Sequence, residues 1–401
     1  MRRRIAGFQA VTDTMILDPG QLRRWSRQVR LPQLGPEGQE KLAAATVAIV
    51  GVGGLGCPAA LYLAAAGVGT LGLIDDDAVD ATNLQRQVLF TERDIGRGKV
   101  EVAAQRLAAM HERLTINQHA TRLTAANARE LLAQYEIVVD GNDNFPTRYA
   151  VNDACVLSGK PNVYGSVLQF EGRASLFVPG HGPCYRCLYA EPPPPGLVPN
   201  CADAGVLGVL PGVIGSIQAA EAIKWICGIG ETLVGRLLVI DMLAMSFDEF
   251  EVARNPQCAL CGDTPTITEP VAYTEFCDTS ANAGEYPDDD YDRDDRITPR
   301  VAKRRIDAGD PIVLLDVREP IELQMAAVQP SQWLPLGEFE QRWQREILPH
   351  RHDEVIVLCH HGVRSRMVVD FLREQGFARA KNLDGGIDRW STDADRSIPR
   401  Y

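Results

Sequence analysis

The sequence lacks an apolar run approaching the roughly 18 residues that a membrane-spanning helix needs, and its first residues lack the apolar core of a secretory signal peptide. Basic residues are also in the minority, with 41 Lys and Arg against 53 Asp and Glu and a net charge of −12. An acidic protein of this kind is a poor binder of nucleic acid phosphates. We therefore expect a cytoplasmic protein with neither a membrane nor a nucleic acid as its partner.

A chain of 401 residues has room for two or three domains, each with its own core. The order of predicted elements divides it into an N-terminal extension (1–20), a first domain (21–261), an acidic flexible linker (262–296) and a second domain (297–401). The linker contains a run of acidic residues at 288–295 without apolar periodicity. Strands and helices alternate in both domains, which predicts an α/β fold: a Rossmann-like, doubly wound mixed sheet, followed by a smaller α/β domain.

A glycine-rich turn follows the first predicted strand, which is apolar and covers 47–50. Gly51, Gly53 and Gly56 form the pattern G-x-G-x-x-G, and Gly54 lies within it. Glycines let the backbone turn tightly and approach a phosphate, and the start of the helix predicted over 58–66 favours an anion. The next strand, at 70–74, ends at Asp75, where a carboxylate can accept hydrogen bonds from ribose hydroxyls. The sequence therefore predicts a nucleotide site.

Two basic side chains beyond this strand bear on which nucleotide binds. Arg86 and Lys99 lie in the segments Asn-Leu-Gln-Arg-Gln and Gly-Arg-Gly-Lys-Val. In a nicotinamide site two cations have little to neutralise beyond one pyrophosphate, whereas over a triphosphate they can stabilise the α-phosphoryl group and the leaving pyrophosphate. Asp143 follows the strand predicted at 136–140, at the edge of the sheet where ligands bind in open α/β sheets. These residues favour ATP, and an NAD-dependent oxidoreductase is the alternative.

The chain has ten cysteines, which in a cytosolic protein indicate metal binding or catalysis more than disulfides. Four of them form two C-x-x-C pairs about seventy residues apart: Cys184, Cys187, Cys258 and Cys261. Four thiolates from two such pairs make a tetrahedral structural zinc site. A redox pair or unligated thiols are the alternatives, but a redox C-x-x-C usually opens a helix next to a strand.

In the second domain a cysteine stands at a strand end. The strand predicted at 354–358 ends at Cys359, and the loop that follows opens onto a helix, an arrangement that favours the thiolate. The loop residues are His360, His361, Gly362, Val363, Arg364 and Ser365. Cysteine-type phosphatases need five residues between Cys and Arg, whereas four separate Cys359 from Arg364 and six separate it from Arg366. The smaller loop suits a single sulfur atom, carried as a persulfide.

The first domain resembles a known family. The glycine motif, the two segments with Arg86 and Lys99, and the segment from Asp140 to Asn144 look like those of the MoeB/ThiF branch of the ubiquitin-activating enzyme superfamily, over about 22–261. The resemblance implies Mg²⁺-dependent adenylation, by ATP, of the C-terminal glycine of a small ubiquitin-fold sulfur carrier ending in Gly-Gly. It implies that Asp75 contacts the ribose and that Asp143 binds magnesium, beside Asn144. The residues that it implies near the phosphates are Asn83, Arg86, Gln87 and Lys99.

The same resemblance implies a homodimer, because Arg27 would reach the ATP of a neighbouring subunit. Cys201 follows four consecutive prolines and would take up the carrier as a thioester or as a disulfide-linked acyl species. A buried packing role is the alternative for this cysteine.

The second domain resembles a rhodanese over 297 to about 395, on the segment around Cys359 and on the segment at 382–390. The resemblance implies that Cys359 accepts sulfur from a persulfide donor such as a cysteine desulfurase, or from thiosulfate. One departure is that residues 326–335 lack the His-Ile-Pro-Gly-Ala stretch that usually follows Asp-Val-Arg-Glu-Pro. An inactive scaffold is the alternative for this domain.

Together the two domains are similar to fusion enzymes of the MoeZ type. We expect adenylation of a sulfur carrier followed by transfer of the persulfide sulfur, which gives a thiocarboxylate. Besides the oxidoreductase, a non-catalytic docking protein that presents a carrier to another enzyme stays open.

Overall fold

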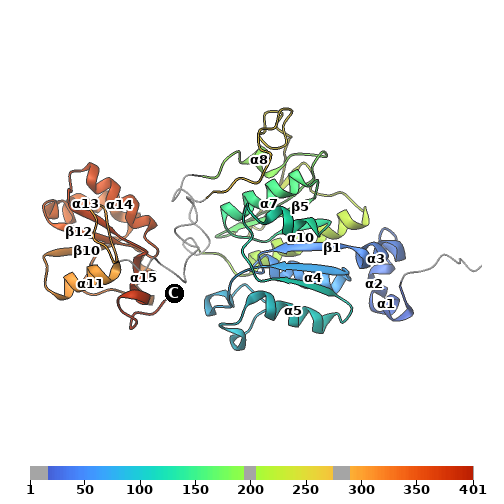
Figure 1. Cartoon of the computed structure of the whole chain (residues 1–401), viewed down its shortest axis with the longest axis horizontal. Coiled ribbons are helices and arrows are strands. Elements are labelled where there is room, and N and C mark those ends of the chain that lie inside the picture. Colours follow the sequence, from blue (N-terminus) through green and yellow to red (C-terminus); the bar gives the residue numbers. More distant parts are fainter. Residues whose placement is uncertain (1–16, 194–204, 274–289, 401) are drawn as a thin grey trace, which may run out of the picture. The chain divides into compact units, whose positions relative to one another are not determined.

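The computed structural model describes residues 17–193, 205–273 and 290–400 of the chain (Figure 1). These residues form two compact units, a larger one at 17–191 and 205–272 and a smaller one at 290–400. Within these described ranges no helix is both long enough and apolar enough to cross a membrane.

The larger unit is built on one eight-stranded sheet. Its strands are β1 (Thr46–Val50), β2 (Thr70–Ile74), β3 (Thr115–His119), β4 (Ile137–Asp140), β5 (Asn162–Leu168), β6 (Glu171–Phe177), β7 (Arg236–Asp241) and β8 (Ser246–Glu251). Their order is β3-β2-β1-β4-β5-β6-β7-β8, parallel as far as β5 and antiparallel from β5 to β8. The predicted doubly wound mixed sheet is thereby confirmed.

Helices cover both faces of this sheet. They are α1 (Pro19–Arg24), α2 (Ser26–Val29), α3 (Gly35–Ala44), α4 (Gly56–Ala66), α5 (Lys99–Met110), α6 (Ala128–Ala133), α7 (Phe145–Leu157), α8 (Tyr185–Leu188) and α10 (Val209–Cys227), with 3₁₀ turns η1 (Ala81–Asn83) and η2 (Glu92–Asp94). Side chains of β1 alternate between two cores, because successive residues of a strand point to opposite faces. Val47 and Ile49 pack with α4, α5 and α10, and Ala48 and Val50 pack with α6 and α7. Figure 1 shows α4 and α7 on opposite sides of β1.

Two helices differ from the prediction. The sequence of residues 22–31 predicts one helix, but the structure divides it at Trp25. The buried indole of Trp25 donates a hydrogen bond to the carbonyl oxygen of Ala65 (2.9 Å) and so ties this turn to α4. The sequence also predicts a helix over 125–133 capped by Thr124, but the helix begins at Ala128. The Thr124 amide instead donates to the Asn127 side chain (2.8 Å) in a turn before the helix.

The smaller unit has a five-stranded parallel sheet. Its strands are β9 (Arg296–Ile297), β10 (Ile312–Asp316), β11 (Gln332–Trp333), β12 (Glu354–Leu358) and β13 (Ala380–Leu383), in the order β11-β10-β12-β13-β9. Its helices are α11 (Pro299–Asp307), α12 (Pro320–Met325), α13 (Leu336–Glu346), α14 (Val363–Glu374) and α15 (Gly386–Asp393), with the 3₁₀ turn η3 (Leu348–His350). Alternate residues of β12 pack against α13 and α14 on one face and against α11 and α15 on the other (Figure 1).

The end of the predicted linker belongs to this smaller unit. Asp292 pairs with Arg305, and Asp295 pairs with Arg366 (2.8 and 2.7 Å). Arg296 is already part of β9. These acidic side chains therefore have partners within the fold, which the charge pattern alone did not reveal. The prediction of an acidic flexible linker was wrong for residues 290–296.

Candidate functional site

The glycine turn lies where the strand order of the larger sheet reverses. β1 and β4 end side by side there, and a Cβ added to Gly51 (φ +84°) would lie 2.8 Å from the carbonyl oxygen of Gly141. A Cβ on Gly56 would lie 1.9 Å from the carbonyl oxygen of Gly51. Only glycine permits these approaches. Ligands of open α/β sheets bind in the crevice at such a reversal, so the turn is a candidate nucleotide site.

Asp75 and Lys99 stand beside this turn. The Asp75 carboxylate accepts hydrogen bonds from the amides of Val52 (2.7 Å) and Asp77 (2.9 Å), and burial raises its pKa to about 6. Lys99 is buried, and its Nζ donates to Asp77 (2.8 Å). Burial acts to lower the pKa of Lys99, but the charges of Asp75, Asp77 and Asp143 outweigh it and the net shift is upward. A buried lysine kept charged in this way favours a bound anion.

Arg86 and Gln87 reach the same turn from the segment after η1. The Cγ and Cδ atoms of Arg86 lie 3.4 Å from the position of a Cβ on Gly54, and the Nε2 of Gln87 lies 3.7 Å from that of Gly53. Gln87 is 3% exposed, and its Oε1 has no hydrogen-bond partner among the described residues. Because buried amides are normally satisfied, Gln87 fits a ligand that completes its hydrogen bonds.

The other residues expected at the nucleotide lie as follows. Asn83 shapes the turn, since its carbonyl oxygen accepts from the amides of Arg86 and Gln87 (3.1 and 2.9 Å). Asn144 caps α7 by accepting from the amide of Thr147 (2.9 Å), and Asp143 before it is exposed. Arg27 is exposed on α2.

Sequence reasoning did not assign a role to a buried pair at the same crevice. Asp140 is fully buried at the end of β4, with Oδ2 3.8 Å from the Nε of Arg148, and Arg148 donates to the carbonyl oxygen of Asn142 (2.9 Å). Burial raises the pKa of Asp140 to about 7, against the opposing effect of Arg148. The signal was present, because a carboxylate ends an otherwise apolar strand, but its partner lies on the following helix.

The four cysteines of the C-x-x-C pairs come together. Their sulfur atoms lie within 4.8 Å of one another, and the Cys184–Cys258 and Cys187–Cys261 distances are 3.7 and 3.3 Å. A tetrahedral zinc ion about 2.3 Å from each sulfur needs sulfurs about 3.8 Å apart. The cluster therefore fits structural zinc. It leaves no open position for a substrate, because all four ligands come from the chain.

A buried ion pair positions this cluster. Arg186, between the first two cysteines, donates from Nε and Nη2 to both carboxylate oxygens of Asp153 on α7 (2.7 and 2.8 Å). The amide of Val271, beyond the second pair, donates to the same carboxylate (3.2 Å). The chain on both sides of the cluster is thus fastened to α7.

Replacing Cys258 with serine should release the metal and lower the melting temperature by roughly 10 °C, because a structural zinc site contributes several kcal/mol or more to folding. Zinc content by elemental analysis and thermal unfolding measure the effect. Cys227→Ala, which removes a buried cysteine outside the cluster, is the matched control and should keep one zinc per chain. If the wild-type protein contained no zinc, or if removing its zinc left the melting temperature unchanged, the assignment would be wrong.

In the smaller unit, Cys359 lies at the end of β12 and is 1% exposed. Its Sγ accepts hydrogen bonds from the amide of Gly362 (3.1 Å) and from the hydroxyl of Ser365 (3.2 Å). Gly362 adopts φ +91° and precedes α14, so the loop curls back over the sulfur. These donors stabilise negative charge on the sulfur, as a thiolate or persulfide requires.

The segment at 382–390 holds this loop from the other side. The amide of Ile387 donates to the carbonyl oxygen of Cys359 (2.9 Å). The amide of Asp388 donates to the carbonyl oxygen of His360 (3.1 Å). A Cβ on Gly386 would lie 2.3 Å from the carbonyl oxygen of His360. The Asn382 side chain donates to the carbonyl oxygen of Gly362 (3.1 Å). These contacts satisfy the carbonyl oxygens of Cys359, His360 and Gly362, and the amide of Gly362 donates to the sulfur.

The segment at 326–335, which lacks the usual His-Ile-Pro-Gly-Ala stretch, packs into the core and adds a strand to the sheet. Ala326 and Val328 are buried in the core, and residues 332–333 form β11 beside β10. The indole of Trp333 donates to the carbonyl oxygen of Arg318 (2.8 Å). Cys201, the remaining predicted site residue, lies outside the described residues.

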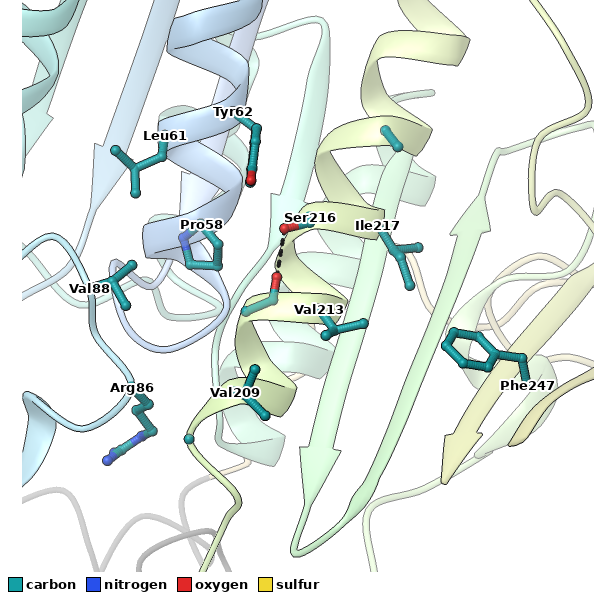
Figure 2. Close-up of a pocket in the computed structure, with 13 residues that line it drawn as sticks. Pro58, Leu61, Tyr62, Arg86, Val88, Val209, Val213, Ser216, Ile217 and Phe247 are labelled. Carbon is teal, nitrogen blue, oxygen red and sulfur yellow. Dashed lines mark hydrogen bonds between the residues drawn. The ribbon is translucent and has the colours of Figure 1, made fainter. Parts of the chain in front are cut away.

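An apolar groove of about 750 Å³ lies between α4 and α10 (Figure 2). Tyr62, Val88, Val209 and Phe247 line it, and each of these side chains is more than half exposed. Arg86 stands at its edge, so the groove borders the nucleotide crevice.

Comparison with known proteins agrees with this geometry. Residues 25–260 match the ThiF family, and residues 298–393 match the rhodanese-like domain. The chain belongs to the ThiF family. It is 42% identical over 386 residues to the probable adenylyltransferase/sulfurtransferase MoeZ of Mycobacterium tuberculosis, an alignment that covers 94% of this chain and 95% of the relative.

Two further similarities each cover about three fifths of this ThiF-family chain. The sulfur carrier protein adenylyltransferase of Thermus thermophilus is 53% identical over 262 residues, 64% of this chain and 97% of that protein. The crystal structure of E. coli MccB with ATP has a TM-score of 0.52 and 28% identity, and the match covers 60% of this chain and 74% of that one. The glycine turn thus lies in the segment that matches the ThiF family, and the cysteine loop lies in the segment that matches the rhodanese-like domain.

Proposed function

We propose that this protein is an adenylyltransferase and sulfurtransferase that activates the C-terminal glycine of a ubiquitin-fold sulfur carrier with ATP and then transfers sulfur to it. The observation that carries the proposal is the gathering of Arg86, Gln87 and Lys99 around one glycine turn. Relatives named as adenylyltransferases and sulfurtransferases, aligned over most of the chain, support it.

In the first step a carboxylate oxygen of the carrier's last glycine attacks the α-phosphorus of ATP, and pyrophosphate leaves with the electron pair of the broken P–O bond. Lys99 and Arg86 stabilise the negative charge that develops on the phosphates, and Gln87 orients them. Asp75 receives the ribose hydroxyls. Asp143 supplies a carboxylate oxygen of the kind that Mg²⁺ prefers, and the metal would neutralise phosphate charge there.

In the second step the terminal sulfur of a persulfide on Cys359 attacks the carbonyl carbon of the acyl adenylate, and AMP leaves. The product is an acyl disulfide between the carrier and Cys359. A thiolate, for which we propose Cys201, attacks the sulfur of Cys359 and releases the carrier thiocarboxylate. The resulting protein disulfide is reduced by an external thiol. The sulfur on Cys359 comes from a persulfide donor such as a cysteine desulfurase, or from thiosulfate.

We also propose a homodimer, in which a second copy covers the apolar groove between α4 and α10. Because Arg86 lines the groove, a second copy that binds there lies next to the proposed phosphate site. In this dimer the exposed Arg27 of one copy reaches the ATP of the other. Exposed apolar surface of this extent favours association. A monomer in analytical ultracentrifugation at micromolar concentration would contradict the dimer.

The docking-protein alternative has less support, because such a protein has no need of Arg86, Gln87 and Lys99 at the crevice. An oxidoreductase would bind NAD and release no pyrophosphate. The deciding experiment is ATP–pyrophosphate exchange with the full chain and a panel of ubiquitin-fold carriers ending in Gly-Gly. Exchange that depends on one carrier is expected. Binding of ATP without exchange in the presence of every carrier would favour docking, and binding of NAD would favour the oxidoreductase.

A further inference from the structure

The arginine of the sulfur-binding loop is already paired with a carboxylate. The Nη1 and Nη2 atoms of Arg364 donate to the two carboxylate oxygens of Glu322 on α12, each at 2.6 Å. The two side chains are only 19% and 14% exposed. A bidentate pair of this kind is strong and geometrically specific, and water screens it weakly in a half-buried site. The loop therefore presents a pair of opposite charges that is neutral overall.

Glu322 is itself held in place. Its Oε2 also accepts a hydrogen bond from the amide of Glu319 at the start of α12 (2.9 Å). The carboxylate thus caps its own helix while it binds the arginine. For Arg364 to bind a substrate anion, its ion pair with Glu322 must break, because the helix cap holds the Glu322 carboxylate in place.

The other charges around Cys359 are balanced in the same way. Arg366 pairs with Asp295 (2.7 Å), and Asp388 accepts from Arg400 (2.7 and 3.0 Å). Burial, with a smaller contribution from its neighbour His361, lowers the pKa of His360 to about 4, so this ring is uncharged near neutral pH. The polar contacts of the sulfur come from neutral donors, the amide and hydroxyl described above.

Sulfur donors differ in the charge that this pocket must accept. Thiosulfate is a dianion: attack by the Cys359 thiolate on its outer sulfur breaks the S–S bond, and sulfite leaves with two negative charges. An alkyl persulfide in its S–SH form is neutral: the same attack on its outer sulfur releases a thiolate and leaves Cys359–S–SH. A free arginine at the loop would stabilise thiosulfate and departing sulfite far more than a neutral donor.

We propose that Glu322 determines donor specificity: by neutralising Arg364, it disfavours small dianionic donors and leaves the loop suited to a persulfide carried on a cysteine. The inference rests on the proposed role of Cys359 as sulfur acceptor, and it adds the class of donor that this acceptor takes.

The test is Glu322→Gln in the full chain, since the amide oxygen of glutamine can still accept from the Glu319 amide. Sulfur transfer to cyanide is measured with two donors: thiosulfate, and the persulfide of N-acetylcysteine amide, which reacts through its neutral S–SH form. We expect the KM for thiosulfate to fall about ten-fold with kcat within two-fold, and kcat/KM for the neutral persulfide to change less than two-fold. Glu338→Gln, which breaks an exposed pair with Arg342 on α13, is the matched control and should change neither donor.

The double variant Glu322→Gln/Arg364→Gln should lose the gain with thiosulfate, because the freed cation is absent. An unchanged KM for thiosulfate in Glu322→Gln would overturn the inference, as would equal changes with both donors, which would indicate a general disturbance of the loop. Failure of the proposed function gives a different result: the wild-type protein would then transfer sulfur from neither donor.

Discussion

Replacing Cys359 with alanine abolishes sulfur transfer to cyanide, with an expected loss of at least roughly 1,000-fold, while carrier-dependent ATP–pyrophosphate exchange stays at the wild-type rate. The reason is that Cys359 is the proposed nucleophile that accepts the sulfur, whereas the Gly362 amide and the Ser365 hydroxyl donate hydrogen bonds to a sulfur but do not supply one. A thiocyanate assay and the exchange assay on the same preparation measure both steps.

The matched control for this variant is Cys227→Ala, which removes a buried thiol of α10 in the other unit. It should retain sulfur transfer. Loss of pyrophosphate exchange in Cys359→Ala would contradict the division of labour between the two units. Residual sulfur transfer above a few per cent would identify another acceptor.

Replacing Arg86 with alanine should have the opposite effect, a loss of roughly 10²–10³-fold in carrier-dependent exchange with sulfur transfer unchanged. Arg86 crosses the glycine turn, where its charge would stabilise the phosphates during departure of pyrophosphate. Among the residues that we assign to the phosphates, Lys99 is then the one cation left.

Arg93→Ala is the control, because Arg93 is an exposed arginine of the neighbouring turn η2 and its removal changes the net charge equally. It should keep the wild-type exchange rate. If Arg86→Ala retained exchange, or if both variants lost it alike, the role of Arg86 at the phosphates would be wrong. Fluorescent ATP-analogue binding would separate lost affinity from lost chemistry.

Local sequence patterns determined a large part of this architecture. Alternating strands and helices predicted both sheets, because apolar periodicity is a property of neighbouring residues. The glycine turn, the two C-x-x-C pairs and the cysteine at the end of β12 could be identified for the same reason: each chemistry is concentrated within a few consecutive residues. The resemblance to two families, on those same motifs, added the reaction.

Only the tertiary structure decided which charges remain available. Arg364 belongs to the loop around the sulfur, but its partner Glu322 lies 42 positions earlier in the chain, on another helix. The acidic residues at 292 and 295 were expected in solvent, and they pair with Arg305 and Arg366 of the fold.

The same limit applies to the nucleotide crevice, where Gln87 is buried against the glycine turn and Asp140 is buried beside Arg148. Burial and pairing depend on which segments the fold brings together. The sequence alone thus determined most of the secondary structure, the motifs and the kind of chemistry. The fold decided the electrostatics of each site, because a charge acts through neighbours in space, and those neighbours come from distant parts of the chain.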